Sequence, residues 1–193
     1  MSEQPPADVP DWEDEYLDRV SDRLMYNYDL EKDVTVHGEP FDLAGAMRIE
    51  SEKHFFHPAL NYANHESQEY VYARRQDAVS VADLEALVEV AHDVADERVE
   101  YTDTHFSTDV TIVIVVPSID PAVEAFVSSF SDRTLLKFGF NGHYEINLVV
   151  SAPERRDIAY SENADVWQAF QTWEPIETEE PGLFQLITRR LQI

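Results

Sequence analysis

The stretch Val110–Val116, VTIVIVV, decides the fold. Successive side chains of a β-strand point to opposite faces, so a strand with one face in water alternates polar and apolar residues. After Thr111 this stretch is apolar at every position, which predicts a central strand covered on both sides. The rest of the chain must therefore supply elements that cover two faces of one sheet.

Amphipathic helices are predicted before and after this strand. Ser80, with Asp83 three residues later, has the pattern of a capping box that opens a helix. Asp120-Pro121 reads as a cap followed by proline at the first helical position. Apolar residues at helical spacing predict two further helices, over residues 11–28 and 163–173.

Strand patterns fill the remaining segments. Alternating or β-rich stretches predict strands at residues 33–37, 41–50 and 69–74, while residues 53–67 show no clear period and read as a loop. A β-hairpin is predicted after the Asp120 helix. The expected order is αβββαβαββα, which predicts an α+β fold with a mixed sheet of about five to six strands and helices packed on it.

The predicted hairpin, KFGFNGHYEINLVV at 137–150, mixes titratable and apolar residues on one face. With Asn141-Gly142 as a two-residue turn, Phe140 lies opposite His143, and their shared face suits the wall of a binding groove. In the alternative interpretation this is an edge hairpin whose His and Glu sit at its rim. The candidate groove residues are His143, Glu145, Asn147, Lys137, Phe138 and Phe140.

The charge balance indicates the environment of the protein. Among 193 residues there are 39 acidic and 14 basic ones, giving a net charge of −25, and the acids are spread along the chain. Such a chain repels itself in dilute salt, and a Debye length of about 3 Å near 1 M salt screens most of that repulsion. This composition resembles cytosolic proteins of salt-in halophilic archaea. The alternatives are an ordinary acidic protein and a nucleic-acid mimic.

The composition also bounds location and partners. There is no cysteine, no apolar run long enough to span a bilayer and no basic-then-apolar signal, so a cytoplasmic protein without membrane contact is expected. Binding to phosphate backbones needs a basic surface, which this sequence lacks, so nucleic acid is not an expected partner.

Four segments are predicted along the chain. A flexible N-terminus (1–10) precedes a single domain (11–173), an acidic linker (174–182) and an amphipathic tail (183–193). The tail is expected either to dock on its own domain or to form a homodimer.

Histidines gather in KHFFHPALNYANHE, residues 53–66. His54, His57, His65 and Glu66 offer nitrogen and oxygen ligands to zinc or a similar divalent metal, although their spacing matches no specific zinc motif. In the alternative interpretation the histidines cap turns. No other cofactor is predicted.

The order helix, three strands, helix, strand over residues 11–117 resembles the core of the PD-(D/E)xK nuclease superfamily. That resemblance implies Asp42 as the first metal-binding carboxylate, with Glu50 and Lys53 as further candidates. The E-x-K spacing is missing at both places where it is expected. The resemblance therefore implies at most an inactive relative.

Arginines occur as three adjacent pairs, at 74–75, 155–156 and 189–190. Two of the pairs follow predicted strands, so they can converge on an anionic ligand, although surface ion pairing is the interpretation that we favour.

The sequence as a whole resembles haloarchaeal domains of unknown function. The leading hypothesis is a non-enzymatic binding or interaction module. The alternative is a metal-dependent hydrolase or a nuclease-like enzyme, and whether the protein is an enzyme at all stays open.

Overall fold

The computed structural model describes residues 9–52, 64–100, 102 and 105–175. The helices are α1 (Glu15–Leu24), α2 (Val81–Arg98), α3 (Pro121–Ser129) and α4 (Trp167–Phe170), with 3-10 turns at Leu136–Gly139 and Pro153–Arg155. The strands are β1 (Asp29–Val36), β2 (Glu39–Glu52), β3 (Asn64–Arg75), β4 (His105–Val115), β5 (Asp132–Leu135), β6 (His143–Ala152) and β7 (Asp157–Tyr160).

All the strands belong to one mixed sheet, which confirms the predicted α+β fold. The strand order is β1-β2-β3-β4-β6-β5, and β7 also pairs with β6. Strands β3, β4 and β6 are parallel, while β1, β2 and β3 form an antiparallel meander. The predicted central strand, β4, therefore lies between two parallel neighbours.

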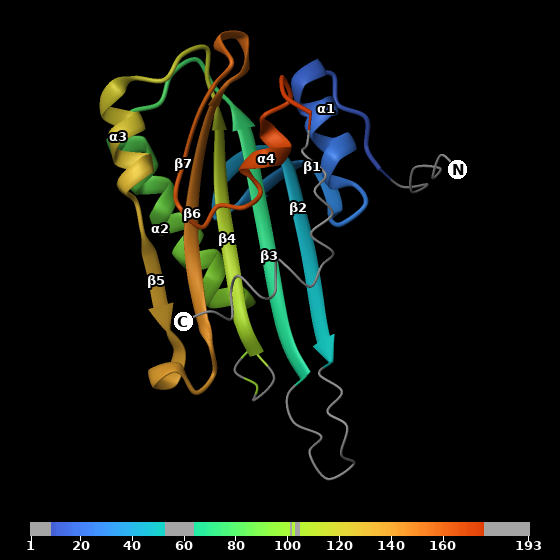
Figure 1. Cartoon of the computed structure of the whole chain (residues 1–193), viewed down its shortest axis with the longest axis vertical. Helices are drawn as coiled ribbons and strands as arrows, with labels where there is room; N and C mark the ends of the chain where they lie inside the picture. Colours follow the sequence, from blue (N-terminus) through green and yellow to red (C-terminus); the bar gives the residue numbers. More distant parts are fainter. Residues whose placement is uncertain (1–8, 53–63, 101, 103–104, 176–193) are drawn as a thin grey trace.

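Helices cover both faces of the sheet (Figure 1). On one face α2 and α3 pack against β4 and β6 through a cluster that includes Leu84, Ile112 and Leu148. On the other face α1 and α4 pack against Val113 and Val149. Ile112 and Val113 are adjacent in β4 and point to opposite faces, which explains why this strand is apolar at consecutive positions.

The predicted helix caps are present. Ser80 accepts a hydrogen bond from the N–H of Asp83, whose carboxylate accepts one in return from the N–H of Ser80. Asp120 caps α3 ahead of Pro121. Asp14, which the sequence did not single out, caps α1 by accepting from two backbone N–H groups. These side chains satisfy amides that a helix start leaves without partners.

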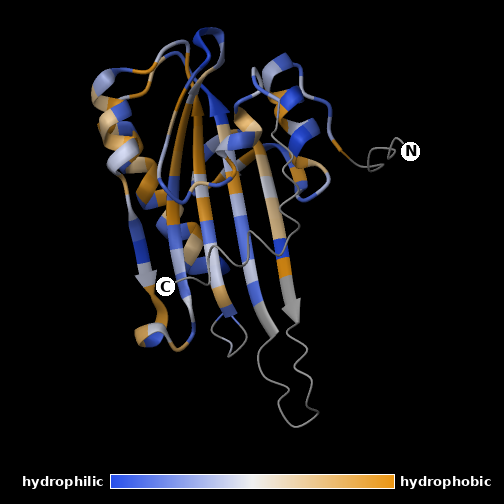
Figure 2. Ribbon diagram, in the orientation of Figure 1, coloured by the Kyte–Doolittle hydropathy of each residue, from blue (hydrophilic) through white to orange (hydrophobic). Residues whose placement is uncertain are grey.

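The α1/α4 face changes character along the strands. The carboxyl halves of β3, β4 and β6 carry apolar residues such as Val71, Val113 and Val149 under the two helices. Two to four residues earlier, the same face carries Glu69, Asp109 and Glu145 instead. Figure 2 shows the change as hydrophilic colours along the lower parts of these strands. A group of buried polar side chains therefore lies near the middle of the sheet, on the α1/α4 face.

One edge of β6 is shared by two short strands. β5 pairs with residues 143–146 and β7 pairs with residues 149–152. Ser161 lies at the seam, because its Oγ accepts from the N–H of Leu148 (3.0 Å) and its N–H donates to the Leu148 carbonyl (2.9 Å). The backbone of β6 thus stays paired across the gap.

Several boundaries differ from the sequence-based expectation: β1 begins at Asp29 rather than at residue 33, and β7 was not predicted. The first helix is shorter than 11–28, and residues 64–67, expected in a loop, begin β3. The last helix is only one turn, because Ala164 and Trp167 make tight i to i+3 turns before it. Of the predicted linker only Glu174 and Pro175 lie within the described residues, and the tail at 183–193 lies outside them.

Candidate functional site

Polar residues of three neighbouring strands form one row across the sheet. Glu69 of β3 is in register with Asp109 of β4, which is in register with Glu145 of β6. Arg133 of β5 continues the row beyond Glu145. Residues in register on adjacent strands share a face, so three carboxylates lie side by side on the α1/α4 face.

Asp109, His143 and Glu145 form the tightest group among these polar side chains. Each has a potential ligand atom within 4.8 Å of those of the other two. All three are buried, with exposed fractions of 3%, 8% and 7% respectively. Their backbones belong to central strands rather than to loops, so the group is held in a fixed arrangement.

Neighbouring side chains hold this group in place. The amide of Asn163, just before α4, donates to the Glu145 carboxylate. Arg133 approaches Nδ1 of His143 at 3.3 Å. A guanidinium group can only donate, so this contact forms when Nδ1 of His143 acts as the acceptor.

Thr111 lies two residues after Asp109 and therefore on the same face of β4. Its side chain is 1% exposed, and its hydroxyl makes no hydrogen bond with any residue in the described part of the chain. A buried hydroxyl without a partner costs about 1–3 kcal/mol. The boundary between the polar and apolar halves of this face thus contains a free donor and acceptor.

The structure brings together half of the predicted groove residues. His143, Glu145 and Asn147 lie on one buried face, as their period of two implies. Lys137, Phe138 and Phe140 do not join them, because residues 136–139 form a 3-10 turn. Phe138 and Phe140 are 97% and 87% exposed.

The predicted two-residue turn at Asn141-Gly142 is wrong. Leu135, rather than Phe140, lies opposite His143. Asn141 is tied to the segment before β4 instead: its amide donates to the Thr102 carbonyl (2.9 Å), and its carbonyl pairs with Nδ1 of His105 (2.7 Å). These contacts lengthen the connection to residues 136–142.

The predicted histidine site is described only in part. His54 and His57 lie outside the described residues, as does the side chain of His65. Glu66 forms an ion pair with Arg48 (3.3 Å) and is not part of the Asp109 group. The metal ligands predicted from residues 53–66 therefore stay a prediction.

The nuclease-like candidates are described only at Asp42. Its carboxylate accepts the backbone N–H of Arg75 at 2.7 Å and so joins the ends of two strands. The side chain of Glu50 and the whole of Lys53 lie outside the described residues.

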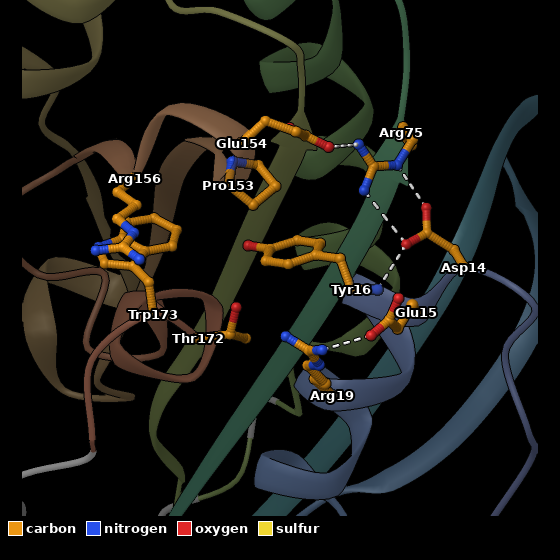
Figure 3. A pocket seen from close by; sticks show the side chains of 10 residues that line it. All are labelled: Asp14, Glu15, Tyr16, Arg19, Arg75, Pro153, Glu154, Arg156, Thr172 and Trp173. Carbon is orange, nitrogen blue, oxygen red and sulfur yellow. Dashed lines mark hydrogen bonds and ion pairs between the residues drawn. The ribbon is translucent and has the colours of Figure 1, made fainter.

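A cavity of about 490 Å³ lies at the other end of the parallel strands, beside their carboxyl ends (Figure 3). Two of the predicted arginine pairs contribute to it, through Arg75 and Arg156, and Arg19 of α1 is a third arginine. Ligands of α/β sheets commonly bind outside the carboxyl ends of strands. The described residues that line it are Asp14, Glu15, Tyr16, Arg19, Arg75, Pro153, Glu154, Arg156, Thr172 and Trp173.

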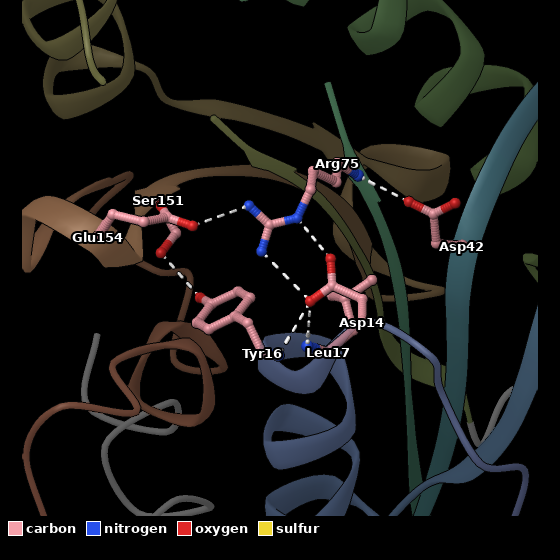
Figure 4. A network of polar contacts seen from close by, with 7 residues as sticks. All are labelled: Asp14, Tyr16, Leu17, Asp42, Arg75, Ser151 and Glu154. Atoms are coloured by element: carbon pink, nitrogen blue, oxygen red, sulfur yellow. Dashed lines mark hydrogen bonds and ion pairs between the residues drawn. The ribbon is translucent and has the colours of Figure 1, made fainter. Parts of the chain in front are cut away.

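Arg75 is the hub of a polar network in one wall of this cavity (Figure 4). Its guanidinium donates to both oxygens of Asp14 and to Glu154. Burial alone would raise the pKa of Asp14, but hydrogen bonds from Arg75 and from the N–H of Leu17 outweigh it and lower the pKa below its usual value. The same bond to Asp14 raises the pKa of Arg75.

Tyr16 forms the floor of the cavity. Its hydroxyl donates to the Phe170 carbonyl (2.6 Å) and pairs with Ser151 Oγ (2.8 Å). Burial raises the pKa of this phenol well above its ordinary value, so it stays protonated in neutral solution.

Sequence reasoning missed Asp109, Glu69 and Asn163. Asp109 lies directly before the stretch Val110–Val116 that predicts the central strand. Ser107, Asp109 and Thr111 are polar at every second position and therefore share one face of this strand. This alternation of polar residues at 107, 109 and 111 is the signal in the sequence that could have identified Asp109. Its neighbours on β3 and β6 depend on strand register, which a single sequence does not provide.

The chain belongs to the family described as Domain of unknown function (DUF8052), whose model matches residues 13–172. No curated protein and no solved structure matches the chain. Within the described residues no helix has both the length and the apolar character needed to cross a bilayer.

Proposed function

We propose that this domain is a binding module that holds a divalent transition-metal cation between β4 and β6. Asp109, His143 and Glu145 are the proposed ligands, and the observation that carries the proposal is that their ligand atoms lie within 4.8 Å of one another. Ligands of a tetrahedral zinc ion stand about 2.1 Å from it and so about 3.4 Å apart. The limit of 4.8 Å is wider than this spacing, so binding requires the three side chains to close around the ion.

The ligand chemistry favours zinc or manganese over calcium. Calcium takes six to eight oxygen ligands, whereas an imidazole with two carboxylates suits the first-row transition metals. The hydroxyl of Thr111, two residues from Asp109, supplies a partner for a water molecule on the ion. Asn163 fixes Glu145 from behind, as outer partners of metal ligands commonly do.

Arg133 competes with a cation at this site. Its guanidinium occupies Nδ1 of His143, and its positive charge opposes a second one nearby. Because the Arg133 side chain stands on the exposed strand β5, a bound ion can displace it. The Arg133→Gln variant should therefore bind the cation more tightly than the natural protein.

Isothermal titration of the full chain with Zn²⁺ and Mn²⁺ in 2 M KCl tests the proposal. We expect one site, loss of at least about 10-fold in affinity in Asp109→Asn, and unchanged binding in Glu89→Gln, which removes an exposed carboxylate from α2. Binding that is lost instead in His54→Ala/His57→Ala would assign the metal to the predicted histidine site. Equal binding by Asp109→Asn and the natural protein would refute the proposal.

A metal-dependent hydrolase is the second candidate, and Glu69 favours it. This carboxylate is 6% exposed and in register with Asp109, where a general base would stand beside a metal-bound water. Hydrolysis of a generic phosphodiester by the zinc- or manganese-loaded protein, lost in Glu69→Gln while metal binding persists, would establish the enzyme. If the nuclease-like residues Asp42, Glu50 and Lys53 form the active site instead, hydrolysis of the phosphodiester should be lost in Asp42→Asn.

We further propose that the protein works in the cytoplasm of a halophilic archaeon. The net charge of −25 supports this setting, because molar salt screens the repulsion among dispersed carboxylates. Thermal unfolding should shift upward strongly between about 0.1 M and 2 M KCl. An unchanged midpoint of thermal unfolding would contradict the proposed high-salt environment.

We also propose that residues 183–193 form a homodimer contact. Sedimentation of the full chain and of a chain that ends at residue 182 tests this proposal.

A further inference from the structure

We propose that the cavity beside the carboxyl ends of β3 and β6 binds an organic anion in which a phosphate or carboxylate is joined to a planar ring. This ligand is additional to the metal ion proposed above, and its site is built from different residues. The cavity of about 490 Å³ falls in the range of 300–1,000 Å³ that is usual for small-molecule sites.

Charge is distributed unevenly around this cavity. The protein carries 14 basic residues and a net charge of −25, yet three arginines and three acids line this one space, so its local charge balances. A region without net negative charge is where an anion meets the least repulsion. The three arginines, Arg19, Arg75 and Arg156, reach it from α1, β3 and the turn after β6.

Arg75 positions the site and does not itself receive the ligand. Three of its five N–H donors bond to Asp14 and Glu154, and its guanidinium lies 5.7 Å from the centre of the Tyr16 ring. It therefore holds the start of α1 against the end of β3. Removing it would disturb the cavity wall as well as any ligand contact.

Arg156 is the residue that the geometry leaves available. It forms no ion pair and no side-chain hydrogen bond with any residue that the structure describes, and it is exposed. Its backbone is left-handed (φ 54°, ψ 44°) after the 3-10 turn at 153–155, a conformation uncommon for a residue with a side chain. This turn directs successive side chains differently, so Arg156 lines the cavity and Arg155 does not.

Arg19 provides a second donor from the opposite wall (Figure 3). It pairs with Glu15 one helical turn away, and the two side chains are 61% and 82% exposed. Exposed pairs of this kind contribute little stability, so a ligand oxygen can replace the carboxylate at small cost. Two guanidinium groups on opposite sides suit the several oxygens of a phosphate or carboxylate.

Aromatic groups supply the surface for the ring of the ligand. Trp173 and Tyr16 both line the cavity (Figure 3). Planar rings stack on indole and on guanidinium planes, and the hydroxyl of Thr172 adds a polar contact. A bare inorganic anion would leave this surface unused.

Calorimetric titration of the full chain in 2 M KCl with EDTA uses three probes: AMP, inorganic phosphate and benzoate. High salt suppresses the long-range repulsion of the anion by the protein, and EDTA removes the proposed metal ion. We expect AMP to bind more tightly than phosphate by about 10-fold or more, because only AMP engages the aromatic wall. Benzoate binding in place of AMP would assign the head group as a carboxylate.

The matched variants are Arg156→Gln and Arg155→Gln, adjacent residues of the same chemistry. Arg156→Gln should weaken binding of the preferred probe about 10-fold or more, and Arg155→Gln less than 2-fold. Trp173→Leu should abolish the preference for AMP over phosphate. Equal effects of the two arginine variants, or absence of binding by all three probes at millimolar concentration, would overturn the proposal. Asp109→Asn should leave this binding unchanged, so failure here is distinct from failure of the metal site.

Discussion

The two halves of the α1/α4 face differ although they belong to the same three strands. In the carboxyl half, Val71, Val113 and Val149 are fully buried against α1 and α4. In the amino half, Glu69, Asp109 and Glu145 occupy equivalent positions in the pleat and are buried almost as well. The same strands β3, β4 and β6 continue in register across the boundary, so the main difference lies in side-chain chemistry. One half stabilises the fold through apolar packing, and the other gathers polar and charged side chains whose burial costs stability.

The largest expected effect on stability comes from placing a carboxylate, the group that the amino half carries, in the apolar carboxyl half. Val113→Asp places a carboxylate under α1 and α4 with no partner, and should lower the free energy of unfolding by about 3 kcal/mol or more. Denaturant unfolding in 2 M KCl measures this. The control is Asp109→Asn, four residues earlier on the same face, which should change stability by less than about 1 kcal/mol. Equal losses would mean that the two halves are not distinct.

A smaller effect is expected from Val113→Thr. This change keeps the branched shape but adds a hydroxyl that has no partner among the apolar neighbours of Val113. The free energy of unfolding should fall by about 1–2 kcal/mol, as measured by the denaturant midpoint at constant slope. A loss near zero would indicate that water reaches this half of the face.

The reverse change, Thr111→Val, should stabilise the protein. The Thr111 hydroxyl is buried without a partner, so its removal relieves a desolvation penalty of about 1 kcal/mol. The same unfolding measurement, run in EDTA, detects the gain. A loss of stability in this variant would show that the hydroxyl has a partner in solution, such as a bound water.

The smallest effect concerns pH and the cavity wall. The folded-state pKa of Asp14 lies below its ordinary value of 3.8, so its charge contributes stability that is complete above about pH 5 and is lost as the pH falls through the folded pKa. Asp14→Asn keeps a capping side chain and removes only the charge. The stability difference between it and the natural protein should therefore narrow between pH 6 and pH 3. In the Asp14→Asn background, Arg75→Met should add no further pH dependence.

Local rules in the sequence predicted the elements that depend on local chemistry. Ser80 and Asp120-Pro121 identified two helix starts, and the apolar run after Thr111 identified β4 as central. Surface ion pairing was the favoured interpretation of the adjacent arginines, and Arg74 and Arg75 do form ion pairs, while Arg75 and Arg156 also line one cavity.

The features that the sequence did not reveal depend on distant contacts. The strong turn signal of Asn141-Gly142 failed because Asn141 bonds to Thr102 and His105, residues about 36–39 positions earlier. The Asp109 group depends on the parallel register of β4 with β6, which α3 and β5 separate along the chain. Such pairings are set by tertiary packing rather than by local propensity.

Because the edge partner of β6 changes at Ser161, we expect the two ends of β6 to open to solvent independently of each other. Because β5 contributes only four residues to the edge of β6, it can detach without disturbing β7 or α4. Amide hydrogens of residues 143–146 should then exchange with solvent faster than those of 149–152, with Leu148 as the boundary. Detachment of this kind also carries Arg133 away from His143, so the imidazole of a buried histidine becomes accessible only when this end of β6 opens.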